Sequence, residues 1–384
     1  MKIPFVKAPV VGNEEEYLLE SFRSGYHGGG GSFTRKCHKF MYEKFTIGKA
    51  MMTTSGTDAL EMTAFLINGQ PGDEFIVPSY TFSSTANAFA SKGMIPVYCE
   101  IREDTLNIDE NKIEELITEK TKAIVPIHYA GIPAEMDKIN TIAKKYNLPV
   151  IEDAAQAFNS KYNGKYAGTL CELGIFSFHA TKSYSSGEGG ALTMNNEKYY
   201  DRAEFLWEKG TDRSLVVQGL KNKYSWVDYG SSFLPSDLLS ALLYAQFQNL
   251  DLMQERRKKL HDSYVSAFKP LEALGLTMTC VPDNIETNYH AFWLLFNNSI
   301  QRDKFLELSL SKDISPYIGY MPLHSSPMGK KLGGDKYNLP ITDHVSESIV
   351  RLPFYLMTDE EIEYTCSNLY ETAKIIYDCS YISN

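Results

Sequence analysis

The chain has 384 residues, enough for two or more domains with large hydrophobic cores. Apolar residues make up 43% and charged residues 22%, as in an ordinary globular protein, and no run of about 18 apolar residues predicts a membrane span. The formal net charge of -10 argues against a nucleic-acid-binding protein, and an anionic substrate would have to meet a local basic patch.

Helical and extended patterns alternate from about residue 50 to about residue 210, which predicts βαβ units and a mostly parallel sheet. We expect helices at 58–69, 81–93, 111–121, 135–147 and 197–210, and strands at 73–78, 94–101, 122–129, 148–155, 165–169, 174–179 and 189–195.

The pattern changes beyond about residue 235. Residues 236–268 form one long helical stretch of the kind that connects two domains, and residues 290–297 read as a strand between the helical segments 302–311 and 359–376. We therefore predict a large domain at 1–245 and a smaller α/β domain at 246–384. The N-terminal stretch turns acidic too early for a signal peptide, and the six cysteines are scattered without a CxxC pair, so we expect a cytoplasmic protein with reduced thiols and no metal site.

Three segments place chemically useful residues where a strand or a turn ends. The first is TTSGTDAL, residues 53–60, in which small and hydroxyl residues lead directly into a helix. Free N–H groups at such a helix start bind phosphate, and Gly56 lets a ligand approach the backbone closely. Simple helix capping by Ser55 or Thr57 explains the same pattern equally well.

The second segment is VIEDAAQA, residues 150–157, an apolar strand that ends in Glu152 and Asp153. The third is FSFHATKSYSSGEGG, residues 176–190, with Lys182 among hydroxyls and glycines. A lone acid or lysine is usually a solvated surface charge. A lysine whose pKa is lowered by burial or by a neighbouring cation instead becomes a nucleophile toward carbonyls.

Taken together, these segments predict a phosphate cradle, an acid and an amine at one edge of a sheet, because ligands gather beyond the carboxyl ends of parallel strands. Pyridoxal phosphate requires this combination: its aldehyde binds a lysine, its ring nitrogen pairs with an acid, and its phosphate needs donors.

The ordered set of segments resembles the DegT/DnrJ/StrS sugar aminotransferases over essentially the whole chain. It comprises TTSGTDAL, PGDEFIVPSYTFSSTANA, HYAG, VIEDAAQA, FSFHATKSYSSGEGGA and PLH. The resemblance implies a pyridoxal-phosphate-dependent transferase of fold type I, similar to aspartate aminotransferase, with a large α/β/α domain and a smaller C-terminal domain. It also implies a homodimer with its site at the subunit interface.

The resemblance also implies residue roles. Lys182 matches the catalytic lysine that carries the cofactor and moves the proton, and Asp153 matches the partner of the ring nitrogen. Phe82 matches an aromatic residue that stacks on the ring, although core packing would explain it as well. The other cofactor contacts implied are Gln156 beside the ring hydroxyl, Ser177, Gly56 and Thr57 at the phosphate, and Ser232.

Ser232 departs from the family pattern, in which many members carry an asparagine that reaches the phosphate of the neighbouring subunit. His324 and Tyr320 lie where relatives approach the sugar, and Arg35, Lys209 and Arg213 are candidates for the diphosphate of a nucleotide sugar. Charges on exposed helices are more often simply solvated. His128 and His179 fit either a core role or a site role.

The segments GGSFTR, EKGT and YGSS are most similar to members that aminate C4 of a sugar nucleotide. They imply transfer of the amino group of L-glutamate to dTDP-4-keto-6-deoxy-D-glucose, giving dTDP-4-amino-4,6-dideoxy-D-galactose for enterobacterial common antigen or O-antigen polysaccharide. A C4 enzyme that makes the gluco epimer, a 3-keto sugar aminotransferase and a non-catalytic binding protein are the alternatives. The related 3-dehydratases carry histidine in place of the lysine, which Lys182 argues against.

Overall fold

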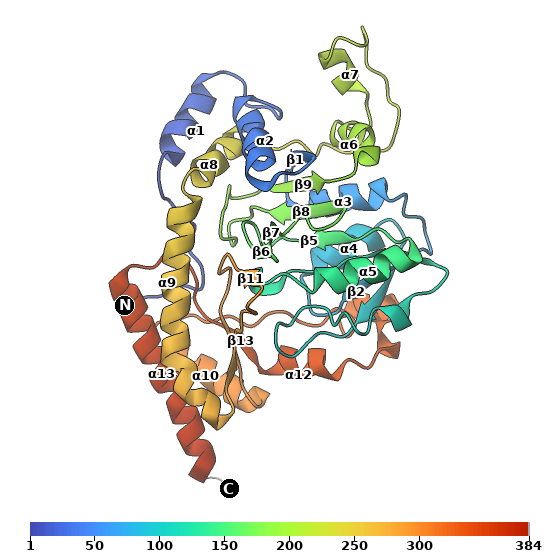
Figure 1. The fold of residues 1–384 in the computed structure, drawn as a ribbon. Helices are drawn as coiled ribbons and strands as arrows, with labels where there is room; N and C mark the ends of the chain where they lie inside the picture. The colour runs from blue at the N-terminus through green and yellow to red at the C-terminus, as the bar shows by residue number, and fades with distance from the viewer. Residues whose placement is uncertain (383–384) are drawn as a thin grey trace.

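The computed structural model describes residues 1–382, and a mostly parallel main sheet forms the centre of its larger part (Figure 1). A four-stranded group in the order β1-β9-β8-β5 and a three-stranded group in the order β3-β2-β4 are joined by bridges between Ile124 and Val150 and between Ile127 and Asp153. Within the main sheet, β9 runs antiparallel to both of its neighbours, and the other strand pairs are parallel. The strands are β1 (Lys49–Thr53), β2 (Glu74–Pro78), β3 (Ile95–Cys99), β4 (Thr121–Ile124), β5 (Ile151–Asp153), β8 (Leu173–Ser177) and β9 (Gly190–Met194).

Helices cover both faces of the main sheet because its strands are apolar on both sides. In β2, Phe75 and Val77 pack toward one layer of helices and Ile76 packs toward the other. The first layer holds α3 (Gly56–Leu66), α4 (Ser83–Ala90) and α6 (Tyr200–Trp207). The second holds α2 (Ser32–Phe45), α5 (Met136–Tyr146) and α8 (Asp237–Phe247), and α1 (Glu14–Arg23) packs on α8. This three-layer arrangement confirms the predicted α/β fold.

A second hydrophobic core lies around a small antiparallel sheet in the order β10-β12-β13. Its strands are β10 (Thr277–Met278), β12 (Trp293–Leu295) and β13 (Ile349–Arg351), and α9 (Leu250–Phe268), α10 (Ser299–Ser311) and α13 (Asp359–Ile382) pack around it. Ile3 from the start of the chain is also buried in this core. The remaining elements are short: β6 (Lys161–Tyr162), β7 (Lys165–Tyr166), β11 (Ile285–Glu286), α7 (Arg213–Val217), α11 (Pro327–Lys331) and α12 (Pro340–Ser348).

The long helical stretch expected at 236–268 is two helices, since α8 ends at Phe247 and α9 begins at Leu250. Helix α9 runs from the first part of the molecule into the second (Figure 1). Its Met253 belongs to a core beneath the main sheet, whereas its Leu260 belongs to the second core. The division of the chain at residue 245 stays a prediction, and that position lies in the last turn of α8.

One predicted helix is wrong. Residues 111–121 contain only a short 3-10 turn, Glu114–Leu116. The β-branched residues that follow disfavour helix, and the hydroxyl of Thr121 accepts a hydrogen bond from the N–H of Thr118 at 2.9 Å, which offers the backbone a competing turn. Within residues 1–382, no helix is both long and apolar enough to cross a bilayer.

Candidate active site

A cavity of about 430 Å³ lies at the carboxyl ends of the main-sheet strands. The segments that follow β1, β2, β5 and β8 line one side of it, and residues of the second part of the molecule line the other. It contains Gly56, Thr57, Phe82, Asp153, Gln156, Ser177, Lys182 and Tyr320, which are eight of the residues singled out from the sequence. The three segments expected at one sheet edge therefore do meet there.

Lys182 lies on the connection between β8 and β9. Its N–H donates to the carbonyl of His179 at 2.8 Å, and the connection is tied by bonds from Ala180 to Gly187 and from Phe178 to Gly189, each 2.7 Å. The side chain is half-buried and lines the cavity. Desolvation by the surrounding protein lowers the pKa of Lys182 to about 8. Asp153 partly opposes the shift and Arg351 adds to it.

Asp153 is the last residue of β5 and is 4% exposed. Its Oδ2 accepts a hydrogen bond from the Thr85 hydroxyl at 2.6 Å, and its Oδ1 accepts one from the N–H of Ala155 at 3.1 Å. These two donors fix the carboxylate at the wall of the cavity. The carboxylate also acts on Lys182 electrostatically, so the two charged groups share one site.

The amino end of α3 forms another wall of the cavity. Ser55 caps the helix by accepting the N–H of Asp58 at 3.1 Å, so the capping expected from the sequence is present. Gly56 and Thr57, the first two helical residues, line the cavity, and helix N–H groups at these positions have no intrahelical acceptor. A Cβ on Gly56 would lie 2.8 Å from Cβ of Ser177, so only glycine allows α3 to approach the end of β8 so closely.

Gln156 and Tyr320 close the cavity on the side of the second core. The Gln156 amide oxygen accepts the N–H of Ala130 at 2.8 Å, and its amide nitrogen donates to the Tyr320 hydroxyl at 2.9 Å. Phe82 is 56% exposed and its ring centroid lies 6.0 Å from that of Tyr320. This exposure excludes core packing as the explanation for Phe82.

These groups fit pyridoxal phosphate. A desolvated amine, a fixed carboxylate, a helix N-terminus and an exposed aromatic ring line one cavity, and each has the chemistry that one part of the cofactor needs. Lys182, Asp153 and the start of α3 with Ser177 would hold its aldehyde, its ring nitrogen and its phosphate.

Other predicted site residues lie elsewhere. Arg35 lines a separate hollow of about 630 Å³ together with Arg213. Lys209 and Arg213 both pair with Glu208, at 3.4 and 3.3 Å. Ser232 is exposed and pairs with Glu208 in an isolated β-bridge. None of these four lines the cavity that contains Lys182.

Of the three histidines considered from the sequence, His179 lines the cavity, whereas His128 and His324 do not. His324 is 5% exposed and lies between Ser79, whose hydroxyl is 2.7 Å from its Nδ1, and Asp343, 3.4 Å from its Nε2, so it packs behind the cavity wall. His128 is fully buried, with Nδ1 accepting the N–H of Ala134 and Nε2 lying 3.0 Å from Glu152. His128 is therefore a satisfied core histidine, whereas His179 lines the cavity.

The sequence did not single out Thr85, His290 and Arg351. Thr85 holds Asp153, His290 lies 3.0 Å from the hydroxyl of Ser183 beside Lys182, and Arg351 lines the cavity from β13. Only Arg351 left a recognisable trace in the sequence, since it is a charged residue inside the apolar run IVRLPF.

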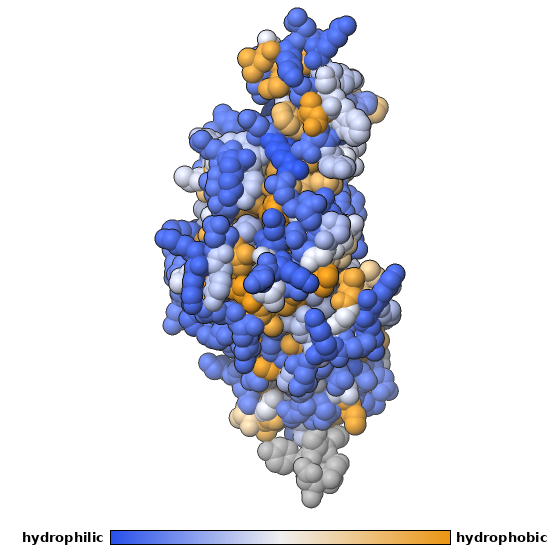
Figure 2. Space-filling view, turned by 90° about the vertical axis from the view of Figure 1, so that its right-hand side faces the viewer, coloured by the Kyte–Doolittle hydropathy of each residue, from blue (hydrophilic) through white to orange (hydrophobic). Residues whose placement is uncertain are grey.

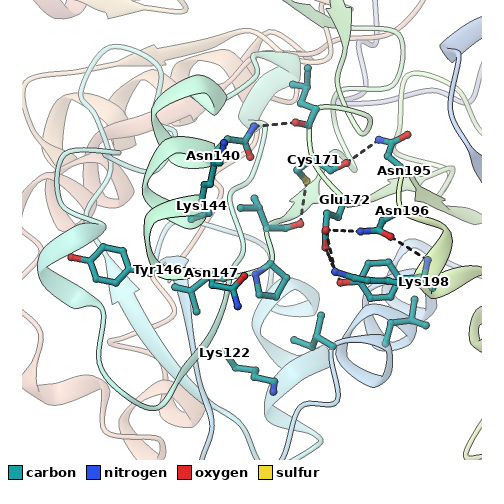
Figure 3. A pocket seen from close by; sticks show the side chains of 18 of the residues that line it. Lys122, Asn140, Lys144, Tyr146, Asn147, Cys171, Glu172, Asn195, Asn196 and Lys198 are labelled. Carbon is teal, nitrogen blue, oxygen red and sulfur yellow. Dashed lines mark hydrogen bonds and ion pairs between the residues drawn. The ribbon is translucent and has the colours of Figure 1, made fainter.

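A larger hollow of about 1240 Å³ lies at the opposite edge of the main sheet (Figure 3). It is lined by residues that precede β5 and β8, and its acid is engaged within the protein: Glu172 accepts hydrogen bonds from Asn196 at 2.7 Å and from Lys198 at 2.8 Å. Figure 3 shows these two contacts side by side. The three segments expected at one site meet in the smaller cavity instead, so the smaller cavity is the candidate site.

Comparisons with known proteins agree with this geometry. The model of the DegT/DnrJ/EryC1/StrS aminotransferase family matches residues 11–370. GDP-perosamine synthase of Escherichia coli O157:H7 is 30% identical over 96% of this chain and 98% of its own. The spore coat polysaccharide biosynthesis protein SpsC of Bacillus subtilis is 31% identical over 92% of this chain and 93% of its own. The apo structure of Spr1654 from Streptococcus pneumoniae superposes with a TM-score of 0.91 at 25% identity, over 99% of this chain and 100% of that one, and Spr1654 has also been solved in a PLP form.

Proposed function

This chain belongs to the DegT/DnrJ/EryC1/StrS aminotransferase family and is a pyridoxal-phosphate-dependent aminotransferase, and from that premise we propose that its acceptor is a nucleotide-linked keto sugar. The reaction would move the amino group of L-glutamate to C4 of dTDP-4-keto-6-deoxy-D-glucose and give dTDP-4-amino-4,6-dideoxy-D-galactose. The curated relatives GDP-perosamine synthase and SpsC support a sugar acceptor, and SpsC supports a place in polysaccharide synthesis.

One observation supports the chemistry above all others: Lys182, Asp153 and the amino end of α3 line a single cavity. Bound pyridoxal phosphate supplies an electron sink for the pair left behind when a Cα proton departs. Asp153, held by Thr85 and Ala155, would supply the negative charge that keeps the ring nitrogen protonated. The amino end of α3 and the Ser177 hydroxyl would hold the phosphate.

Lys182 would take the proton from the donor's Cα and pass it on, because its amine lies at the cavity wall. With a pKa of about 8, roughly a tenth of its amine is neutral at pH 7, compared with well under a thousandth for an ordinary lysine. The neutral amine is the form that can accept a proton or attack a carbonyl. The same residue then returns the proton when the keto sugar takes the amine, so we expect ping-pong kinetics.

The identity of the nucleotide is the finer part of the proposal. A relative named for a GDP-linked product makes a GDP-linked 4-keto-6-deoxyhexose the second candidate acceptor. Both candidates share the keto carbon at C4, which is the atom the amine must reach.

A second copy of the chain would complete the site, and the reaction would take place in the cytoplasm. The residues expected at the sugar diphosphate or the partner's phosphate, Arg35, Lys209 and Ser232, lie outside the cavity of their own subunit. Residues 210–230 form an arm that carries α7 and projects from the molecule (Figure 1). Arg35 lines a hollow together with Arg213 and Val217 of the arm, and Lys209 and Ser232 both contact Glu208 at its base. The arm exposes Val217 to 78% and Trp226 to 80%. Figure 2 shows hydrophobic side chains at the top of the molecule, where the arm lies. Apolar surface of this kind favours association.

The test is to identify the product by NMR after mixing the enzyme, pyridoxal phosphate, L-glutamate and dTDP-4-keto-6-deoxyglucose, with the GDP-linked sugar in a parallel sample. An axial C4 amine on the dTDP sugar would support the proposal, and an equatorial amine would make the enzyme the gluco-specific alternative. Amination of the GDP sugar alone would overturn the dTDP assignment. If neither sugar is aminated, 3-keto sugar nucleotides become the substrates to test.

A further inference from the structure

A buried histidine contacts the residue next to Lys182 from the opposite side of the cavity. His290 lies on the segment that leads into β12, and its Nδ1 is 3.0 Å from the hydroxyl of Ser183. The two residues are 5% and 3% exposed, and His290 lines the cavity. Ser183 follows Lys182 directly in the chain, so this contact connects the segment that carries the amine to the opposite wall. The chemistry described so far does not use it.

The hydrogen bond has one direction that satisfies both groups. Among residues 1–382 the Ser183 hydroxyl has no other hydrogen-bond partner, so Nδ1 is the one protein acceptor for its proton. A neutral imidazole offers one acceptor nitrogen and one donor nitrogen, which makes Nδ1 the acceptor and leaves the ring proton on Nε2. The arrangement requires a neutral ring, because the charged form has no acceptor nitrogen.

The surroundings of His290 keep its ring neutral. Burial holds the pKa of His290 well below its usual range, and the positive charges of Lys182, Arg351 and Arg257 lower it further. Among the described residues no carboxylate offsets these charges. His290 therefore remains an acceptor throughout the pH range in which Lys182 gains or loses its proton.

The backbone of His290 is anchored, whereas the amine of Lys182 is not. Arg257 of α9 donates to the carbonyl of His290 at 2.7 Å and to that of Tyr289 at 3.0 Å, which fixes this segment against the helix. The Lys182 amine has no hydrogen-bond partner among residues 1–382 and ends a chain of four rotatable bonds. The position of the Lys182 backbone therefore decides which part of the cavity the amine can reach.

We propose that His290 is a positioning residue for Lys182 and acts through Ser183. The imidazole accepts the Ser183 hydroxyl and so holds Lys182 where its amine can reach both the cofactor aldehyde and the donor's Cα. A displacement of about 1 Å in a reacting group can cost about 100-fold in rate, so one buried contact at the base of a flexible side chain can have a large effect. The inference rests on the proposed role of Lys182 and is independent of which sugar is the acceptor.

Amide substitutions at His290 separate the roles of its two nitrogens. Asparagine places its amide oxygen near the position of Nδ1 and can still accept from Ser183, whereas glutamine places its amide near Nε2 and cannot. We expect His290→Asn to stay within about threefold of the unmutated protein in the measurements below and His290→Gln to be impaired. Ser183→Ala removes the donor and should be impaired as much as His290→Gln, and combining the two changes should add nothing further.

Covalent capture of the cofactor aldehyde measures the position of the amine without turnover. Stopped-flow mixing of the cofactor-free protein with pyridoxal phosphate, over the neutral and alkaline range, gives a plateau rate and the midpoint of the amine titration. In His290→Gln and Ser183→Ala we expect the plateau to fall about tenfold and the midpoint to rise by about one pH unit, because a displaced amine is less desolvated. Asp153 and Arg351, the charged groups that act on the amine, are unchanged in these variants.

Holoenzyme gives a second measurement. The donor half-reaction is followed by the absorbance of the cofactor with L-glutamate and no acceptor. In His290→Gln we expect the limiting rate to fall about tenfold and the apparent Kd to stay within about threefold, as a misplaced amine predicts. A raised Kd with an unchanged limiting rate would overturn the inference, since His290 would then contact the amino acid through Nε2. Full activity in His290→Gln with a loss in His290→Asn would overturn it for the same reason.

A buried histidine of the same region serves as the matched control. His261 is 8% exposed, and its ring centroid lies 5.0 Å from that of Tyr289 and 5.3 Å from that of Phe292. It does not line the cavity. In His261→Phe the capture rate, its midpoint and the limiting rate should therefore be unchanged.

Thermal unfolding and one further variant identify which claim has failed. A lowered thermal midpoint in His290→Gln with capture and limiting rate intact would make the contact purely structural and overturn the inference. If Lys182→Ala shows the covalent capture and pH profile of the unmutated protein, the proposed role of Lys182 itself fails. If Lys182→Ala loses capture while His290→Gln and Ser183→Ala match the unmutated protein, only the role of His290 fails.

Discussion

At the scale of single residues, the proposed chemistry depends on the amine of Lys182. Replacing Lys182 with alanine should lower turnover by at least about 1000-fold, because general acid–base catalysis alone contributes about 100- to 10,000-fold and the same residue also tethers the cofactor. The variant should still bind cofactor, since the α3 cradle and Asp153 remain. Turnover and the absorbance of the dialysed protein measure the two effects. Lys165→Ala, an exposed lysine in β7, is the matched control. A rate near that of the unmutated enzyme would contradict the assigned role.

The lowered pKa of Lys182 gives a second prediction at this scale. Capture of the cofactor by the apoprotein requires the neutral amine. The capture rate should therefore rise about tenfold per pH unit up to about pH 8 and level off above it. A solvated lysine would instead make the rate rise until beyond pH 10. Stopped-flow mixing of apoprotein and pyridoxal phosphate across this range distinguishes the two profiles.

At the scale of elements, the amino end of α3 binds phosphate only if it lies against β8. Gly56→Ala places a Cβ 2.8 Å from that of Ser177, so the helix start must move away. We expect the Kd for pyridoxal phosphate to rise about tenfold or more, measured by fluorescence titration. Gly28→Ala is the control, because the added Cβ would find its nearest neighbour at 3.7 Å and fits without adjustment. Unchanged cofactor affinity in Gly56→Ala would remove α3 from the phosphate site.

At the scale of the whole molecule, the exposed arm should hold two copies together. Trp226→Ser removes the most exposed large aromatic side chain of the arm, and we expect the dimer dissociation constant to rise at least about tenfold. Light scattering over a dilution series measures it, and specific activity should fall with dilution if the partner completes the site. Ile300→Ser is the matched control, since Ile300 on α10 is 79% exposed but lies away from the arm. An unmutated protein that is monomeric at all concentrations would rule the proposal out.

The parts of the fold and of the site that depend on the order of neighbouring elements along the chain could be predicted from the sequence. Alternating helices and strands predicted the mostly parallel sheet, and a parallel sheet brings together whatever follows its strands, which is why Gly56, Asp153 and Lys182 could be placed side by side. Residues 111–121 show the limit, because local hydroxyl turns there outweigh a helical pattern. Arg351 shows another limit: its strand belongs to the second core, and only the packing of that core against the main sheet brings the guanidinium into the cavity.

Helix α9 has a mechanical consequence. The cavity has Lys182 on the side of the main sheet and Arg351 on the side of the second core, and α9 is rooted in both cores without a break. An unbroken helix resists bending, so α9 holds the two walls of the cavity at a fixed spacing. Swinging one core toward the other would require unpacking Met253 or Leu260. We therefore expect donor and acceptor to exchange through movements of side chains and short loops rather than through movement of one core against the other.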